Sequence, residues 1–255
     1  MSSIDLNCDM GEGFAFDAAL MPFISSANIA CGFHAGDKDT MRRTVALALQ
    51  HNVAIGAHPS YPDRENFGRI DILGSSVQLS ELHNIITEQI ALLQQVCVEM
   101  GASLHHVKPH GALYNRAARD QAVSALICEA IAAVDPALQF YGLSGSLMQQ
   151  EAELRQFTFI SEVFADRTYQ DDGSLTPRSQ SNALIEEDGI ALQQVLQMIQ
   201  QGSVTAASGK TVPLHADTIC IHGDGAHAVA FARMINETFQ QQNITVSTSQ
   251  KHKTP

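Results

Sequence analysis

Aromatic and basic residues are both scarce in this sequence. Tryptophan is absent and aromatic residues make up only 6% of the chain, which disfavours a non-catalytic binding groove lined by stacking rings. The 15 Lys and Arg residues stand against 27 Asp and Glu residues, which leaves a net charge of −12. Nucleic acid is therefore not an expected partner, because the chain has no basic stripe to neutralise phosphates.

Long apolar runs and paired cysteines are also missing. No segment approaches about eighteen consecutive apolar residues, so no membrane span is expected. The start of the chain, MSSIDLNCD, lacks the positive flank and apolar stretch of a signal peptide. The five cysteines are an odd number without a C-x-x-C pair, which is typical of reduced thiols and speaks against a structural zinc site. These features predict a cytoplasmic protein.

Strand-prone and helix-prone segments alternate along the 255 residues. Helical periodicity is clearest at 119–134 and at 80–100, where Ser80 is a candidate N-cap and Gly101 a stop signal. Shorter helices are predicted at 38–50, 187–199 and 226–239. Seven β-prone runs are predicted at about 4–9, 27–33, 53–58, 104–109, 138–142, 158–163 and 218–223.

This alternation predicts an α/β fold in which parallel strands are joined by right-handed crossovers. A closed or nearly closed, TIM-like (β/α) barrel of seven strands is favoured over an open sheet, because polar corners follow nearly every strand. A single barrel domain is expected over residues 1–242, followed by a polar, poorly ordered tail at 243–255. The weakly periodic stretches 61–77 and 164–184 are predicted to be loops over a site.

The segment Val107–Asn115 is the most informative of these corners. A β-prone stretch leads directly into Lys108, Pro109, His110 and Gly111. Proline has no ladder donor and glycine tolerates unusual dihedral angles, so the backbone is expected to bend where the lysine and the histidine are displayed. Such a junction is typical of the carboxyl end of a strand in an α/β enzyme.

Other predicted strand ends carry similar side chains. Imidazoles and carboxylates do not improve a barrel core, so their repetition at strand ends indicates a functional mouth on which they converge. Asp37 is assigned only the role of a helix cap. The candidate residues at these further corners are Asp9, Glu12, His34, His58, Glu162, His222 and Asp224.

Three familiar motifs are incomplete. The glycines after Asp9 do not form a dinucleotide fingerprint, since Phe16 occupies the third glycine position. Ser208-Gly209-Lys210-Thr211 resembles the end of a phosphate-binding loop, but the preceding glycine is too distant and Pro213 follows, so a β-turn is predicted. Metal-ligand pairs such as H-x-x-x-H are absent, so no metal ligands are assigned, although His and Asp suit divalent ions.

Seven phrases in order resemble the motifs of the LamB/YcsF family, which includes the A subunit of bacterial ATP-dependent 5-oxoprolinase. The resemblance extends from residue 4 to about residue 240. The phrases are LNCDMGEGF at 6–14, NIACGFHAGD at 28–37, GAHPSYPD at 56–63, VKPHGALYN at 107–115, EVFADR at 162–167, LTPR at 175–178 and CIHGD at 220–224.

This resemblance implies a barrel of the glycoside hydrolase/deacetylase type. It also implies cleavage of 5-oxo-L-proline to L-glutamate, coupled to hydrolysis of ATP to ADP and phosphate. The family acts with 5-oxoprolinase subunits B and C, so ATP is expected as a co-substrate bound together with these partners. Two alternatives stay open, a metal-dependent deacetylase of a sugar or small amide and a non-catalytic binding subunit.

The reaction assigns hypothetical roles to the corner residues. Asp9 or His58 would orient or deprotonate water, while Lys108 and His110 would neutralise charge on the lactam oxygen or a phosphate. Arg178 would hold the substrate carboxylate through two hydrogen bonds. The remaining candidates, placed around the substrate, are Glu12, His34, Glu162, His222 and Asp224.

Overall fold

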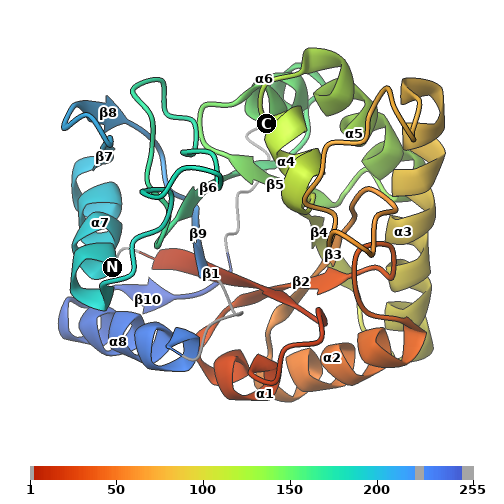
Figure 1. The fold of residues 1–255 in the computed structure, drawn as a ribbon. Helices are drawn as coiled ribbons and strands as arrows, with labels where there is room; N and C mark the ends of the chain where they lie inside the picture. Colours follow the sequence, from red (N-terminus) through yellow and green to blue (C-terminus); the bar gives the residue numbers. More distant parts are fainter. Residues whose placement is uncertain (1–2, 222–226, 249–255) are drawn as a thin grey trace.

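The computed structural model describes residues 3–221 and 227–248. Within these residues, seven parallel strands form a closed barrel, because the last strand pairs both with β6 and with β1 (Figure 1). The predicted seven-stranded (β/α) barrel is thus confirmed. In order around the barrel, the strands are β1 (Ser3–Met10), β2 (Ser26–Ala30), β3 (Ala54–His58), β4 (Leu104–Val107), β5 (Gln139–Leu143), β6 (Phe159–Phe164) and β9 (Thr218–Ile221).

Helices cover the outside of this barrel (Figure 1). The long α3 packs against α2 and α5, and α5 packs in turn against α6. None of the helices in the described part of the chain is both long and apolar enough to cross a membrane. The helices are α1 (Asp17–Leu20), α2 (Lys38–His51), α3 (Leu79–Glu99), α4 (Gly111–Ala117), α5 (Gln121–Val134), α6 (Leu147–Leu154), α7 (Asp188–Gln201) and α8 (Ala228–Gln241), with a 3₁₀ turn η1 (Met21–Phe23).

The interior of the barrel is polar, whereas its outer surface is apolar. Successive side chains of a strand point to opposite faces, and in β1 the polar Asp5, Asn7 and Asp9 alternate with buried apolar residues. Asp5 accepts hydrogen bonds from Ser26 and Thr218, on the two neighbouring strands, at 2.8 and 2.6 Å. Burial of these polar groups is tolerated because they satisfy one another.

Helix boundaries lie close to the predicted ones, but one cap differs. Helix α3 begins after Gln78 rather than Ser80, because Gln78 and Glu81 form a reciprocal capping box. Gly101 follows the helix with a φ of +70°, as expected for a stop signal. Asp37 caps α2 as predicted, and its Oδ1 accepts from the Thr40 amide at 2.7 Å.

Several short elements lie outside the predicted pattern. Helix α4 begins directly after His110, and α6 follows β5. An antiparallel hairpin of β7 (Ser203–Thr205) and β8 (Thr211–Pro213) precedes the last barrel strand. Residues 208–210 lie in the connection between β7 and β8, as predicted for the sequence that resembles a phosphate loop.

The folded part of the chain continues past the expected domain end at residue 242. Strand β10 (Thr245–Val246) pairs in parallel with the start of β1, because Ile244 is buried and holds the segment against the barrel. Residues 243–248 therefore belong to the described fold and not to a free tail. The remainder of the predicted tail, 249–255, lies outside the described residues.

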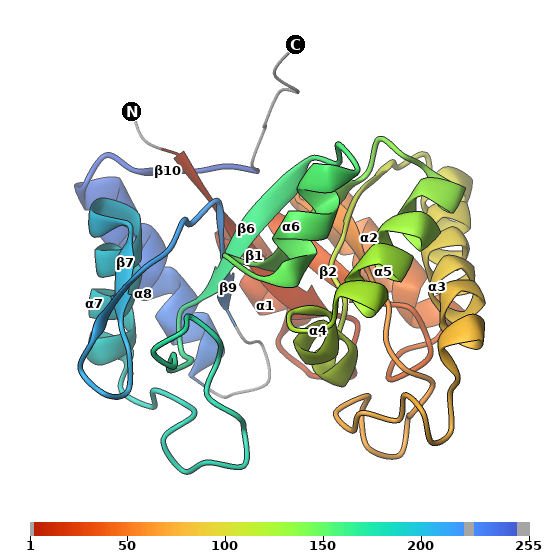
Figure 2. The same cartoon turned by 90° about the horizontal axis from the view of Figure 1, so that it is seen from above.

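The two loops predicted to cover a site leave the barrel at the same end. In Figure 2 the connections from β3 to α3 (orange) and from β6 to α7 (teal) both project from the lower side, where the strands end. All five cysteines are buried and free, which agrees with the prediction of reduced thiols.

Close packing at Gly56 yields a stability prediction. A Cβ added to Gly56 would meet Nε2 of His106 at 2.0 Å. That ring cannot move away easily, because it stacks on Tyr141 at 4.0 Å and is hydrogen-bonded to Asn28 at 2.8 Å. Gly56→Ala should lower the free energy of unfolding by roughly 1–3 kcal/mol or more, as measured by urea denaturation.

The matched control is Gly189→Ala in α7, where an added Cβ meets nothing within 4 Å. This variant should be neutral or about 1 kcal/mol more stable, since alanine is the better helix former. Equal stabilities of the two variants would contradict the packing argument.

Candidate active site

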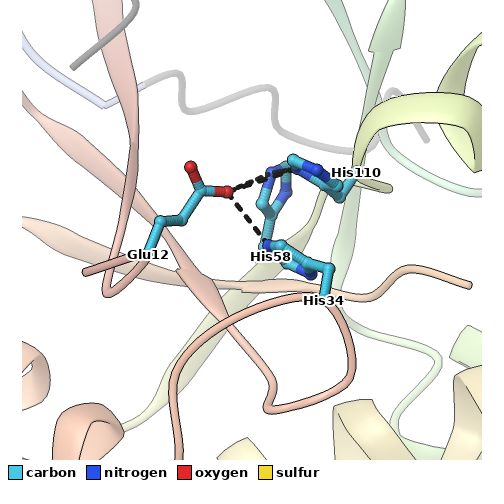
Figure 3. A group of neighbouring side chains, drawn as sticks. All are labelled: Glu12, His34, His58 and His110. Carbon is cyan, nitrogen blue, oxygen red and sulfur yellow. Dashed lines mark hydrogen bonds and ion pairs between the residues drawn. The ribbon is translucent and has the colours of Figure 1, made fainter. Parts of the chain in front are cut away.

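Five strands bring reactive side chains to one end of the barrel. Asp9 lies at the end of β1, His58 ends β3, and Lys108 and His110 follow β4. Figure 3 shows Glu12, His34, His58 and His110 facing one another from separate strand ends. Seven of the ten predicted residues contact one another through hydrogen bonds or ion pairs, namely Asp9, Glu12, His34, His58, Lys108, His110 and Glu162.

Lys108 is the charge at the centre of the group. Its side chain is almost fully buried, with the residue 2% exposed. The ammonium lies 2.9 Å from Asp9 Oδ1 and 2.8 Å from Glu162 Oε1, and it donates to Asn7 Oδ1 at 3.1 Å. Burial disfavours the charged form, but Asp9 and Glu162 outweigh it and raise the pKa of Lys108 well above its usual value.

Asp9 connects the lysine to the histidines. Its Oδ1 accepts from Lys108 and from Asn28 at 2.9 and 2.8 Å, while its Oδ2 lies 3.3 Å from Nε2 of His58. Burial opposes ionisation of Asp9, but the neighbouring positive charges of His58 and Lys108 hold its pKa well below the usual range. Asp9 is therefore an ionised carboxylate that faces both cations.

The histidines surround the carboxylate of Glu12. The His34 ring stacks on His110 with ring centroids 3.8 Å apart, and Nε2 of His34 lies 3.0 Å from Glu12 Oε1. Burial lowers the pKa of His34 to about 4, so this ring is neutral at pH 7. The ligand atoms of Glu12, His34, His58 and His110 all lie within 4.8 Å of one another, so these residues could hold a metal ion.

Glu12 and the three histidines form a possible metal site, whereas no metal ligands were assigned from the sequence. That assignment depended on ligand pairs with short sequence spacing, whereas the four residues come from the ends of four different strands and are brought together only by barrel closure.

The polar layer beneath the site was not predicted from the sequence. Asn28 donates to Asn7 and to Asp9 at 2.8 Å each, and its Oδ1 contacts His106 Nε2 at 2.8 Å. The spacing of polar residues was a signal for this layer. Asn7 and Asp9 are two residues apart and therefore share one face of a strand, and the same is true of His106 and Lys108. Polar residues at every second position of a buried strand would have identified this layer.

Tyr114 is a second residue to which no role was assigned. It lies in α4, is buried, and lines the same cavity as Lys108. Burial and the nearby Glu162 carboxylate raise the pKa of Tyr114 well above its usual value, so its hydroxyl stays protonated and can donate a hydrogen bond. The sequence carried no signal for this role, because the short helix α4 was not predicted.

A cavity of about 940 Å³ opens above these groups. Asp9, Glu12, Lys108 and His110 lie in its wall, and the loop between β6 and α7 contributes Arg178. The predicted substrate clamp therefore lines the same cavity as the buried lysine. His222 and Asp224 lie outside the described residues, so their predicted roles stay predictions.

Arg167 stabilises the loop that carries Arg178. Its buried guanidinium donates to the carbonyls of Thr176 and Ala183 at 2.6 and 3.2 Å, respectively. Because both acceptors belong to the loop between β6 and α7, Arg167 fixes the shape of the cavity wall.

Comparison with known proteins places the chain in a family. The model of the LamB/YcsF family matches residues 4–254. The chain belongs to the LamB/YcsF family. It is 48% identical over 254 residues to the A subunit of 5-oxoprolinase from Bacillus cereus, with 97% of this chain and 99% of that protein covered. It is 49% identical over 251 residues to the A subunit of 5-oxoprolinase from Tolumonas auensis, with 96% and 99% covered.

Solved structures show the same architecture. The crystal structure of a lactam utilization protein from Thermus thermophilus is 37% identical, covers 96% of this chain and 99% of its own, and superimposes with a TM-score of 0.89. A putative cellobiose-phosphate cleavage protein from Enterococcus faecalis shares only 11% identity but superimposes with a TM-score of 0.59, with 97% of each chain covered. This second likeness concerns the fold alone.

Proposed function

We propose that this member of the LamB/YcsF family is the A subunit of an ATP-dependent 5-oxoprolinase. It would open the lactam ring of 5-oxo-L-proline to give L-glutamate while ATP is hydrolysed to ADP and phosphate. The observation that carries this proposal is the buried Lys108–Asp9 pair at the base of a cavity. The chain that holds it is similar over nearly its full length to two proteins that carry the name of this 5-oxoprolinase component.

The chemistry of a lactam requires charge stabilisation. A five-membered lactam is a stable amide, and attack on its carbonyl carbon places negative charge on the oxygen. Lys108 supplies a permanent positive charge in a site shielded from water, where such charge is most effective. The roles of Lys108 and His110 are therefore to neutralise the lactam oxygen or a phosphate attached to it.

The same site contains groups that can activate water. Asp9 is ionised and His58 lies 3.3 Å from it. Asp9 can take a proton from a water molecule as the water adds to the carbonyl carbon, and His58 can do so when its ring is neutral. The C–N bond then breaks, and the ring nitrogen takes up a proton to become the amino group of glutamate.

ATP would enter the reaction through the partner subunits. Transfer of its terminal phosphoryl group to the lactam oxygen releases ADP and makes the carbon more electrophilic, and later hydrolysis releases phosphate. Residues 208–210, which resemble a phosphate loop in sequence, form the connection between β7 and β8 instead. Subunits B and C are therefore proposed as the source of the nucleotide site.

Reconstitution tests this proposal directly. The chain is mixed with subunits B and C, 5-oxo-L-proline and ATP, and glutamate and phosphate are followed together. Equal amounts of the two products, formed only when this chain is present, are expected. ATP hydrolysis without glutamate, or glutamate formation without this chain, would reject the proposal.

Arg178 is predicted to bind the substrate carboxylate. Charge-assisted hydrogen bonds are worth about 1.5–3 kcal/mol, so Arg178→Ala should raise the KM for 5-oxo-L-proline by roughly 10- to 100-fold with little change in kcat. Arg178→Lys should recover only part of the loss, since an ammonium cannot form the paired contact. Steady-state kinetics of the reconstituted complex provide the measurement.

The control is Arg43→Ala, whose side chain contacts Thr40 on the exposed surface of α2. Its KM should equal that of the wild type. A normal KM for Arg178→Ala would remove Arg178 from the substrate site.

A second candidate function is a metal-dependent deacetylase of a sugar or small amide. The observation in its favour is the group of three histidines and Glu12, of which Glu12, His58 and His110 line the cavity. Release of acetate from N-acetylated substrates by the chain alone, with no glutamate formed by the complex, would favour this function over the first.

A further inference from the structure

In two of the histidines, the outer ring nitrogen, the one that does not face Glu12, donates a hydrogen bond. Nδ1 of His58 lies 2.7 Å from the carbonyl oxygen of Lys108, and Nε2 of His110 lies 2.9 Å from the carbonyl oxygen of Phe67. A carbonyl oxygen only accepts, so each of these nitrogens carries its proton. In the neutral rings, Nε2 of His58 and Nδ1 of His110 therefore present lone pairs.

His34 is oriented in the same way by a hydroxyl. Its Nδ1 lies 2.9 Å from Oγ of Ser60, and that hydroxyl donates its own proton to the carbonyl of Tyr61 at 2.9 Å. When the hydroxyl donates to Tyr61 it accepts from His34, and Nδ1 then carries the proton of this ring. In that tautomer the lone pair of His34 is on Nε2.

These three lone pairs converge on one carboxylate oxygen. Oε1 of Glu12 lies 3.0 Å from His34 Nε2, 3.3 Å from His110 Nδ1 and 3.8 Å from His58 Nε2. Nε2 of His58 is nearer to Asp9 Oδ2, at 3.3 Å. The inner nitrogens of His58 and His110 are themselves 2.9 Å apart. Four acceptor atoms at such distances repel one another unless positive charge lies between them.

A single bridging proton does not resolve this arrangement as long as His34 is protonated on Nδ1. A proton shared between His58 and His110 would satisfy the 2.9 Å contact between their inner nitrogens. It would leave the lone pair of His34 facing the Glu12 carboxylate at 3.0 Å. A cation that accepts electron density from all four atoms at once satisfies every contact.

We propose that Glu12, His34, His58 and His110 bind a divalent transition-metal ion of the zinc class. The ligand atoms are Oε1 of Glu12, Nε2 of His34 and His58, and Nδ1 of His110. Three imidazoles and one carboxylate are a typical donor set for such an ion. Metal–ligand bonds of about 2.0–2.2 Å place ligand atoms roughly 3–3.5 Å apart. Three of the observed separations, 2.9, 3.0 and 3.3 Å, are close to this value, the one between Glu12 and His58 is 3.8 Å, and all four atoms lie within 4.8 Å of one another.

The surroundings have the properties of a metal site. His58 and His110 donate their outer N–H groups to carbonyl oxygens, and the outer nitrogen of His34 contacts the Ser60 hydroxyl. Such contacts orient metal ligands in proteins. Glu12, His58 and His110 line the cavity, so an ion can enter and a substrate can reach it. A bound ion of this class would polarise a carbonyl oxygen or a water molecule.

Metal binding can be tested without substrate, so its outcome is independent of the proposed function. The full-length chain is treated with a chelator, dialysed, and titrated with Zn²⁺ by calorimetry. Co²⁺ is added in parallel for visible absorption spectroscopy. We expect one ion per chain, with affinity reduced by roughly 10- to 100-fold in Glu12→Gln and by more in His110→Gln. His51→Gln, an exposed change at the end of α2, should bind like the wild type.

Nuclear magnetic resonance of the imidazole nitrogens provides a readout that does not depend on variants. On addition of Zn²⁺, protons should remain on Nδ1 of His34 and His58 and on Nε2 of His110, while the resonances of the three inner nitrogens shift. Absence of a bound ion in the wild type would overturn the proposal, as would equal Zn²⁺ affinity in the wild type, Glu12→Gln and His110→Gln. Protons on all six nitrogens in the presence of Zn²⁺ would overturn it too.

Discussion

Replacement of Lys108 by alanine is expected to lower kcat/KM for glutamate formation by about 10³-fold or more. Removal of a single neutral donor to a developing oxyanion costs about 10²–10³, and Lys108 adds a full charge in a buried position. The variant also leaves Asp9 and Glu162 without their shared cation. Steady-state assays of the reconstituted complex with 5-oxo-L-proline and ATP provide the measurement.

Loss of the buried cation also affects stability, so folding needs separate control. Removing one partner of a buried ion pair destabilises a protein by about 3–5 kcal/mol. The double variant Lys108→Ala/Glu162→Gln removes one of the two negative charges as well and should recover part of this loss, yet it should stay inactive. Lys38→Ala, which removes an exposed ion pair with Glu99, is the surface control.

Addition of a small alkylamine to Lys108→Ala separates chemistry from folding. An amine that occupies the vacated volume restores the positive charge without restoring the lysine side chain. Partial recovery of activity is therefore expected. If folded Lys108→Ala retains activity within tenfold of the wild type, Lys108 has no part in the reaction.

Asp9→Asn should lower kcat/KM by about 10²–10⁴-fold, the range typical of a general base. The amide retains an oxygen that can accept from Asn28 and Lys108, as Oδ1 of Asp9 does. Its nitrogen faces Nε2 of His58 in place of Oδ2. The variant therefore keeps the shape of the site but loses the negative charge, and the reconstituted assay measures the consequence.

The matched control is Asp17→Asn. Asp17 follows the same strand end and accepts from the backbone amide of Gly11 at 2.8 Å, but it is not part of the cavity wall. Its activity should stay within a few-fold of the wild type. Comparable activities of Asp9→Asn and Asp17→Asn, with both proteins folded, would show that the charge of Asp9 is dispensable.

Much of the barrel was predictable because its strands and helices have strong local signals. The run before Lys108 is apolar and ends at a proline and a glycine, and β4 indeed ends at Val107. The shorter elements lacked such signals. Helix α4 spans Gly111–Ala117 and begins with a glycine, so neither its length nor its first residue marks it as a helix.

The site was predictable in part for the same reason. The histidines and acids at strand ends stood out as residues that do not improve a core. Their mutual geometry was not accessible, because Glu12 and His110 are far apart in sequence and meet at 3.3 Å only through barrel closure. Tyr114 lacked an obvious sign of function, since tyrosine is common in ordinary strands and helices.

By itself, the amino-acid sequence determined the alternation of strands and helices, the polar corners after the strands, and the family to which they correspond. These features follow from local hydrophobic periodicity and from residue types at turns. Only the tertiary structure decided that Asp9 and Glu162 share Lys108, and that three histidines gather around Glu12. Such contacts depend on strand order and register, which distant parts of the chain fix together when the barrel closes.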